Sequence, residues 1–183
     1  MKHARRRALL LPLLLTLLAA LAGCADDSSN GRSGFNRTDV TFATEMIPHH
    51  RQSLQLVRMV EQREVDPELS GLAAQIRVTQ AVEIESMLSW LRDWDVAVPS
   101  GDPSVGTGQP GTVTAADLAA LQGSTGADFE REWLRLMIRQ HEDAIAIAEV
   151  ENAEGEYPYA VALANTVMVG QAIQVRTMEL MLG

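Results

Sequence analysis

The chain has 183 residues, of which 15 are basic and 24 are acidic, so its net charge is −9 at neutral pH. This acidity argues against nucleic acid as a partner, because a phosphate backbone requires a basic binding surface. Cys24 is the only cysteine, so no disulfide framework exists and stability must come from a hydrophobic core. An acidic domain of this kind repels its neighbours or attracts cations.

Residues 1–23 have the pattern of an export signal. A basic start precedes an apolar run over residues 8–21, which is too short and too near the N-terminus for a good membrane span. The run ends in Leu21-Ala22-Gly23-Cys24, which resembles a bacterial lipobox. We therefore predict cleavage before Cys24, lipidation of Cys24, and an exported protein anchored in the cell membrane on its extracytoplasmic side. The alternative is an ordinary secretory signal with an incidental cysteine. Loss of residues 1–23 removes four basic residues and leaves a net charge of −13.

Residues 24–37 are polar and are predicted to form a flexible tether, and residues 38–183 to form the domain. Apolar residues recur at helical spacing in four long segments, at about 41–64, 67–94, 128–153 and 158–182. Thr38 or Asp39 is expected to cap the first segment, and Asp66-Pro67 to start the second. Between them lie a predicted surface loop over 98–111 and a short helix from Thr114 to about Gln122. No segment alternates as a strand would, so the sequence predicts an all-α four-helix bundle.

The sequence of the domain repeats itself at an offset of 91 residues. Residues 42–92 and 133–183 share eleven identities in 51 positions without a gap, including Met46 with Met137 and His50 with His141. Two copies of this length indicate an internal duplication, with two helical hairpins that pack about a pseudo-twofold axis. Each half therefore places a histidine at the same level, and a site built from both halves is the first functional hypothesis.

Histidine and methionine are the residues most able to carry chemistry here. His50 lies four residues after Met46, and His141 four after Met137, so each pair shares one helix face. Imidazole nitrogen and thioether sulfur suit soft or borderline metals, above all copper. In antiparallel hairpins, Gln80 and Glu83, and their equivalents Gln171 and Gln174, would lie across from these turns. Glu83 could bind the metal directly or orient a histidine.

A purely structural role is the alternative interpretation of the histidines. A buried histidine that is hydrogen-bonded to Glu or Gln is ordinary in a bundle core, and methionine is usually a packing residue. The Glu-x-x-His pairs of di-iron bundles, phosphate-binding loops and nucleophile motifs are absent, so we expect no enzyme activity. The acidic residues at the end of the third long segment are expected to be solvated; they are Glu149, Glu151, Glu154 and Glu156.

The Met46-Ile47-Pro48-His49-His50 segment, followed by Gln80-x-x-Glu83-x-x-x-Met87-x-x-Trp90-Leu91, resembles the bacterial family called domain of unknown function 305. The resemblance covers about residues 42–183. It implies an exported protein with a ferritin-like four-helix fold that handles copper through histidine and methionine. The family resemblance and the duplication together suggest a set of metal ligands; these are His50, His141, His49, Met46, Met137, Glu83, Met87 and Met178.

The sequence departs from the family pattern at several candidate ligands. Gln140 stands where the second repeat usually has histidine, and Leu56 and Ile147 stand where the family usually has methionine. Thr112-Val113 replaces a methionine-rich segment. The leading hypothesis is an extracytoplasmic lipoprotein that binds a transition metal, most of all copper, in metal homeostasis or tolerance. The alternative is a non-metal interaction module of the cell envelope, with an unidentified protein partner, that keeps the fold around a degenerate site.

Overall fold

The computed structural model describes residues 34–100 and 113–183. The predicted signal, Cys24 and most of the tether lie outside these residues, as does most of the predicted surface loop. Five helices follow one another along the chain, and no strand occurs in the described ranges. Their bounds are α1 Arg37–Glu61, α2 Pro67–Asp93, α3 Ala115–Gly123, α4 Gly126–Glu154 and α5 Pro158–Leu182.

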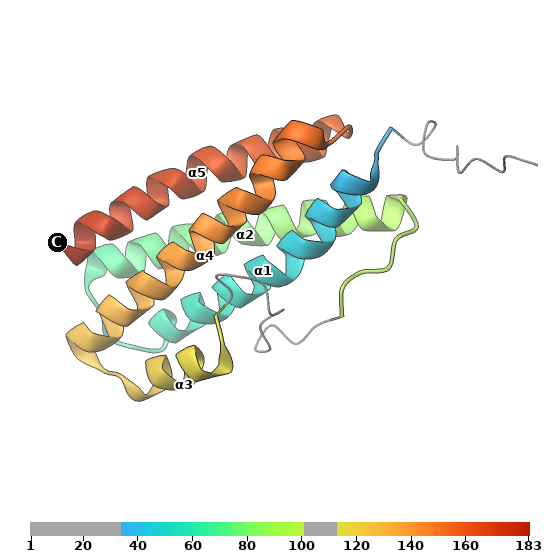
Figure 1. The fold of residues 1–183 in the computed structure, drawn as a ribbon. Helices are drawn as coiled ribbons and strands as arrows, with labels where there is room; N and C mark the ends of the chain where they lie inside the picture. Colours follow the sequence, from blue (N-terminus) through green and yellow to red (C-terminus); the bar gives the residue numbers. More distant parts are fainter. Residues whose placement is uncertain (1–33, 101–112) are drawn as a thin grey trace, which may run out of the picture.

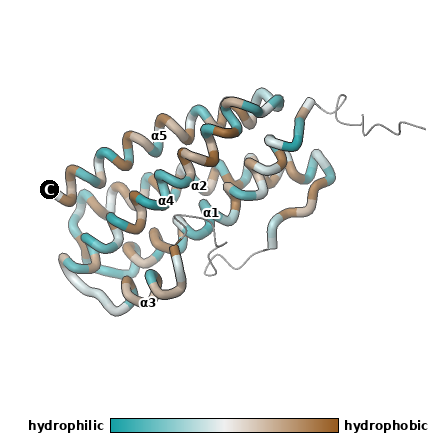
Figure 2. Tube along the Cα trace, in the orientation of Figure 1, coloured by the Kyte–Doolittle hydropathy of each residue, from teal (hydrophilic) through white to brown (hydrophobic). Residues whose placement is uncertain are grey.

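The four long helices form one bundle, which confirms the predicted fold class (Figure 1). α1 and α2 form one antiparallel hairpin, α4 and α5 form the other, and the two hairpins meet mainly where α1 packs against α4. α3 lies at one end of the bundle and packs against α4. Hydrophobic and hydrophilic residues mix along every long helix (Figure 2). Among the described residues, no helix is both long and apolar enough to cross a bilayer.

α1 begins earlier than the sequence predicted. Asn36, rather than Thr38 or Asp39, is the N-cap, and its side chain accepts a hydrogen bond from the Asp39 amide while Asp39 accepts one from the Asn36 amide. This reciprocal pair satisfies two amide groups that a helix start leaves unpaired, which is why the helix extends to Arg37. α1 also ends at Glu61 rather than near Glu64. The predicted caps Asp66 and Thr114 are both confirmed.

Two hydrogen bonds between the hairpins reproduce the 91-residue offset in space. The Asp39 carboxylate accepts a bond of 2.9 Å from the Tyr157 amide, and Glu130 accepts one of 2.9 Å from the Asp66 amide. At the 91-residue offset, Glu130 is equivalent to Asp39 and Tyr157 is equivalent to Asp66. Each hairpin therefore accepts a hydrogen bond from the loop between the two helices of the other hairpin. This reciprocity is the signature of a pseudo-twofold arrangement.

The core divides into two hydrophobic clusters, one toward each end of the bundle. Trp133 anchors one cluster and donates its indole N–H to the Leu56 carbonyl at 2.9 Å, while its equivalent Phe42 anchors the other. The zone between the clusters contains buried polar side chains; these are His49, His50, Gln52, Ser53, Gln80, Gln140, His141 and Gln171. The structure therefore places the polar residues of both repeats at one level of the core.

Glu151 is buried at the end of α4, which corrects the expectation that the acidic cluster is solvated. Its side chain folds back against Gly155, and a Cβ built on Gly155 would overlap both the Glu151 carboxyl group and the Glu151 carbonyl oxygen.

We expect Gly155→Ala to lower the free energy of unfolding by roughly 1–3 kcal/mol, because overpacking forces local displacement. Gly71→Ala, at an open position on α2, should instead stabilise by up to about 1 kcal/mol. Urea denaturation of both variants measures the difference, and equal effects would contradict this packing.

Candidate metal centre

Three histidines from two helices converge on the centre of the bundle. His49 and His50 come from the middle of α1 and His141 from the middle of α4, and all three are buried. The ring centroids of His49 and His50 lie 6.3 Å apart. The charge on either His50 or His141 would influence His49, so the three rings form one electrostatic unit. The prediction that His50 and His141 point into one core is therefore confirmed.

His50 and His141 are held in equivalent ways. His50 Nε2 lies 2.8 Å from a carboxylate oxygen of Glu83, and His141 Nε2 lies 2.8 Å from the amide oxygen of Gln174. Both oxygens can only accept from nitrogen, so each histidine donates its Nε2–H. Neither Nδ1 atom has a partner at hydrogen-bond geometry, although an interaction with the Met137 backbone raises the pKa of His141. The bond at Nε2 is how a neighbouring group orients a metal-binding histidine.

His49 is the least satisfied of the three histidines. It is 5 % exposed, and neither of its ring nitrogens has a hydrogen-bond partner. An unpaired buried polar group costs about 1–3 kcal/mol, so native proteins usually avoid one. Together with the Nδ1 atoms of His50 and His141, four buried ring nitrogens lack partners. Hydrogen bonds within the described protein therefore do not satisfy every ring nitrogen.

Burial keeps the imidazoles of His49 and His141 neutral. Burial lowers the pKa of His49 to about 3, with further contributions from His50 and His141. Burial also lowers the pKa of His141 to about 4, and its hydrogen bond to Gln174 offsets this only in part. A neutral imidazole is the form that coordinates a metal, because the lone pair must be free of a proton. His49 and His141 can therefore coordinate a metal without first losing a proton.

The predicted methionine ligands do not gather at one point. Met46 and Met87 belong to one core cluster, and Met137 and Met178 belong to the other, although all four are fully buried. Within the described residues, no group of three or more His, Cys, Asp and Glu side chains has the geometry to hold a metal ion. The structure thus places the three histidines and Glu83 at one level of the core without closing them around a common point, and leaves one methionine pair on each side of them.

Gln140 has a role that the sequence did not reveal. It donates a hydrogen bond to Gln52 and accepts one from Ser53, and Gln52 bonds both the N–H and the carbonyl of Val113. Gln140, which stands where the family usually has histidine, therefore holds the segment before α3 against the core through its hydrogen bond to Gln52. The repeat comparison aligns Gln140 with His49, and that position marks it as buried, but its partners come from segments that no sequence spacing connects.

Gln80 and Gln171 occupy equivalent buried positions on α2 and α5, as the repeat predicted. The side-chain oxygen of Gln80 and both polar side-chain atoms of Gln171 lack hydrogen-bond partners. An amide in this state can accept a bond from a water or a ligand in the core. These two residues extend the under-satisfied polar zone from the histidines toward the outer helices.

Fold and site together define an internally duplicated helical bundle with a buried histidine centre. The chain belongs to the DUF305 family, a domain of unknown function, whose sequence profile matches residues 39–182. The family resemblance inferred from the Met-Ile-Pro-His-His segment is thereby confirmed. No curated protein sequence matches the chain.

Several solved structures share this fold. A DUF305 fragment from Deinococcus radiodurans has a TM-score of 0.72 and 28 % identity, covering 81 % of this chain and 97 % of that one. A DUF305 protein from Streptomyces coelicolor, described as secreted, has a TM-score of 0.70 and 30 % identity over 77 % and 89 % of the two chains. CopM in its Cu(II)-bound form has a TM-score of 0.70 and 29 % identity over 79 % and 95 %. CopM has also been solved with Cu(I) and with silver.

Proposed function

We propose that this protein is an exported lipoprotein that binds copper at the His49, His50 and His141 centre, without catalysing a reaction, in metal homeostasis or tolerance. The observation that carries the proposal is the set of four ring nitrogens without a hydrogen-bond partner on three buried histidines, of which burial keeps His49 and His141 neutral. The similarity to CopM, which binds copper and silver ions, supports the same class of ligand.

The donor set favours a soft ion of low charge. His49 and His141 are neutral, methionine thioethers lie one helical turn before His50 and His141, and Glu83 is the carboxylate bonded to His50. Burying an ion is costly unless charges are balanced, and a monovalent ion needs less compensation than a divalent one. Thioether sulfur also selects Cu(I) over harder cations. We therefore expect Cu(I) to bind more tightly than Zn(II).

Competition with a Cu(I) chelator should reveal one Cu(I) per purified protein, and His50→Ala/His141→Ala should lower this affinity by about 100-fold or more. In thermal unfolding, copper at roughly 100 times its Kd should stabilise the wild type by about 2.7 kcal/mol through mass action. The double variant should gain nothing. The matched control is Gln140→Ala, which alters the core at an equivalent level without touching a proposed ligand. Equal copper affinity in the wild type and the double variant would refute the site.

The structure changes the pH at which binding should weaken. Unperturbed imidazole predicts a loss of metal toward about pH 6. Because the pKa of His49 is about 3 and that of His141 about 4, protons compete with the metal only at lower pH. Proton competition at these two histidines should therefore change the copper affinity little between pH 7 and about pH 5.5. A steep loss between these values would show that the ligands are solvated.

Cys24→Ser tests the lipid anchor separately from the metal centre. This variant should leave the membrane fraction or accumulate as an uncleaved precursor, since a lipobox cysteine is the site of both processing and acylation. Normal processing and membrane attachment of the variant would contradict the proposed anchor.

A further inference from the structure

The exposed apolar side chains of this protein gather on α2 and α5. Six of the eight large hydrophobic residues that are exposed in the described part of the chain lie on these two helices. Val78 and Val82 of α2, and Val169 and Ile173 of α5, are each more than half exposed. These residues are equivalent at the 91-residue offset, so both repeats present an apolar pair at the same place. Single exposed apolar residues are ordinary, but a set repeated on two helices defines a surface.

The two apolar pairs border one face of the bundle, where α2 and α5 run antiparallel and contact each other (Figure 1). A hollow lies between the two helices and is lined by Ser86, Ser89, Trp90, Tyr159, Ala162, Leu163 and Thr166. Ser89 lies seven residues after Val82, and Thr166 lies seven before Ile173, so each apolar pair shares a helix face with one wall of the hollow. We call the two pairs and the hollow together the α2/α5 face.

The α2/α5 face is nearly uncharged, although the chain as a whole is strongly acidic. Residues 157–175 contain no charged side chain, and none of the residues that line the hollow is charged. On α2, Arg77 forms an ion pair with α1, and Glu83 bonds the histidine centre. Glu85 and Arg176, which are equivalent at the 91-residue offset, have opposite signs. Depletion of charge is the feature that distinguishes the centre of a protein interface from the remaining surface.

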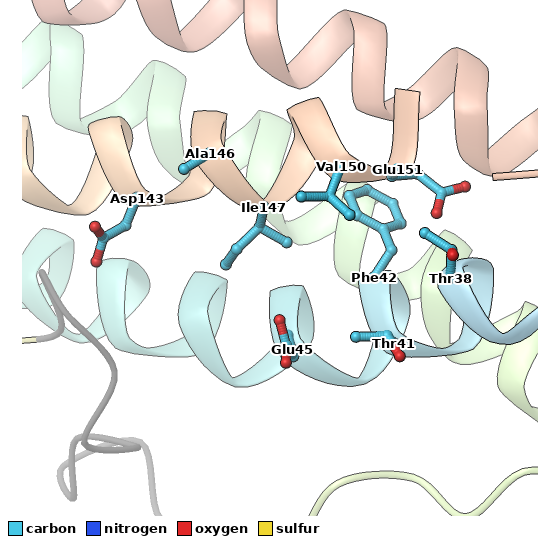
Figure 3. Close-up of a pocket in the computed structure, with 9 residues that line it drawn as sticks. All are labelled: Thr38, Thr41, Phe42, Glu45, Asp143, Ala146, Ile147, Val150 and Glu151. Carbon is cyan, nitrogen blue, oxygen red and sulfur yellow. The ribbon is translucent and has the colours of Figure 1, made fainter. Parts of the chain in front are cut away.

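The side of the bundle formed by α1 and α4 has the contrary character. A groove of about 330 Å³ runs between these helices, and Glu45 and Asp143 are among the residues that line it (Figure 3). None of the described residues that line this groove is basic. Two copies would repel each other here, because like charges opposed across an interface cost several kcal/mol. A second copy of this acidic chain is therefore repelled least at the α2/α5 face.

The symmetry and size of the α2/α5 face suit a dimer. α2 and α5 are equivalent helices of the two repeats and run antiparallel, so the face has an approximate twofold symmetry of its own. A symmetric dimer uses the same patch on both copies. Helices of 25 and 27 residues are about 40 Å long, and two side by side are about 20 Å wide. The face therefore covers roughly 800 Å², which is about what each partner buries in a stable interface.

We propose that two copies of this protein form a symmetric dimer by packing their α2/α5 faces together, with Val82 and Ile173 near the middle of the interface. Both residues come from the middle of their helices. The histidine centre is not part of this face, so dimerisation and copper binding are separate properties. Because the remaining surface of each copy is acidic, apolar contact holds the dimer against a net electrostatic repulsion.

Analytical ultracentrifugation of the purified Cys24→Ser protein tests the proposal, because this change removes the lipid that would itself cause association. The protein should dimerise with a Kd of about 10 µM or tighter. Raising NaCl from about 0.05 M to about 0.5 M should tighten the dimer about threefold or more, because salt screens the repulsion between the acidic surfaces. A protein that stays monomeric up to about 100 µM, or a dimer that dissociates as salt rises, would overturn the proposal.

Three glutamate variants of the same Cys24→Ser protein locate the contact. Val82→Glu and Ile173→Glu should each weaken dimerisation about tenfold or more, since each places two like charges in the interface. The matched control is Val150→Glu, because Val150 is also more than half exposed but lies beside the groove between α1 and α4 (Figure 3). This control should leave the dimer unchanged. Equal weakening in Val150→Glu and Val82→Glu would place the contact elsewhere.

Phosphatidylcholine vesicles provide the remaining arm of the test, because a lipid surface could also cover an uncharged apolar face. The Cys24→Ser protein should not sediment with these vesicles. Vesicle binding by a monomeric protein, lost in Val82→Glu, would assign the α2/α5 face to a lipid surface and refute the dimer. Far-ultraviolet circular dichroism checks that each variant is folded, and the exposure of Val82, Ile173 and Val150 makes unfolding unexpected.

Discussion

In metal-free buffer, the stability of this protein is expected to pass through a maximum near about pH 6.5 and to fall toward both pH 5 and pH 8. On the acid side, His49 and His141 remain neutral when folded, with pKa values of about 3 and 4, but become protonated near pH 6.5 in the unfolded chain. The unfolded state therefore binds more protons below pH 6.5, and stability is lost as the pH falls.

On the alkaline side, Glu151 has the opposite effect. Its folded pKa of about 8 lies above the unfolded value of 4.5, so the folded state holds the extra proton between these values. Stability from this group is present at low pH and is lost as the pH rises through about 8. The His49 and His141 contributions outweigh it below pH 6.5, because two groups act against one.

Two substitutions should separate the limbs of the profile. His49→Gln, which copies the residue at the equivalent position 140, should flatten the acid limb by about 1.4 kcal/mol per pH unit. Glu151→Gln should flatten the alkaline limb and make the acid limb steeper, because the opposing proton of Glu151 is removed. Urea denaturation between about pH 4.5 and 8.5, with a chelator present, measures both. A wild-type profile without an acid limb would mean that water reaches the histidines.

Most of the fold could be predicted because the relevant signals are local or repeated. Asp66-Pro67 and Thr114 cap their helices as short-range chemistry requires, and the 91-residue offset identified the two hairpins. The same offset predicted that His50 and His141 are equivalent, which the matched bonds to Glu83 and Gln174 confirm. The predicted start of α1 was wrong because Asn36 takes the N-cap position and Asp39 is its partner at N3 in the same capping box.

The electrostatic state of the site could not be predicted, because it depends on what surrounds each side chain in three dimensions. Helical spacing places Met46 beside His50, yet the packing assigns the four methionines to two clusters on either side of the histidines. Glu151 looks like its solvated neighbours in sequence, but Asp39 and Gly155 enclose it in the fold. Gln140 stands at the position equivalent to His49, so the second repeat has no matching histidine. Only the structure shows that both ring nitrogens of His49 lack a hydrogen-bond partner.

Asp39→Ala should destabilise the protein far more than the equivalent change Glu130→Ala. Asp39 is 0 % exposed and accepts hydrogen bonds from the amides of Asn36, Glu156 and Tyr157. Its removal leaves buried donors unpaired, at about 1–3 kcal/mol each, and weakens the α1 cap. We expect a loss of roughly 3–5 kcal/mol in the free energy of unfolding, measured by urea denaturation near pH 6.5, where Glu151 is already protonated.

Glu130 makes the same bond to the loop of the other hairpin, but it is partly exposed, so water can replace it. Its substitution should therefore cost less than about 1 kcal/mol. Asp39→Asn should fall between the two, because an amide oxygen can still accept while its NH₂ group faces donors. The comparison tests whether the buried Asp39, rather than the equivalent Glu130, holds the two hairpins together. Equal losses of unfolding free energy in Asp39→Ala and Glu130→Ala would mean that burial does not determine how much each of these equivalent hydrogen bonds contributes.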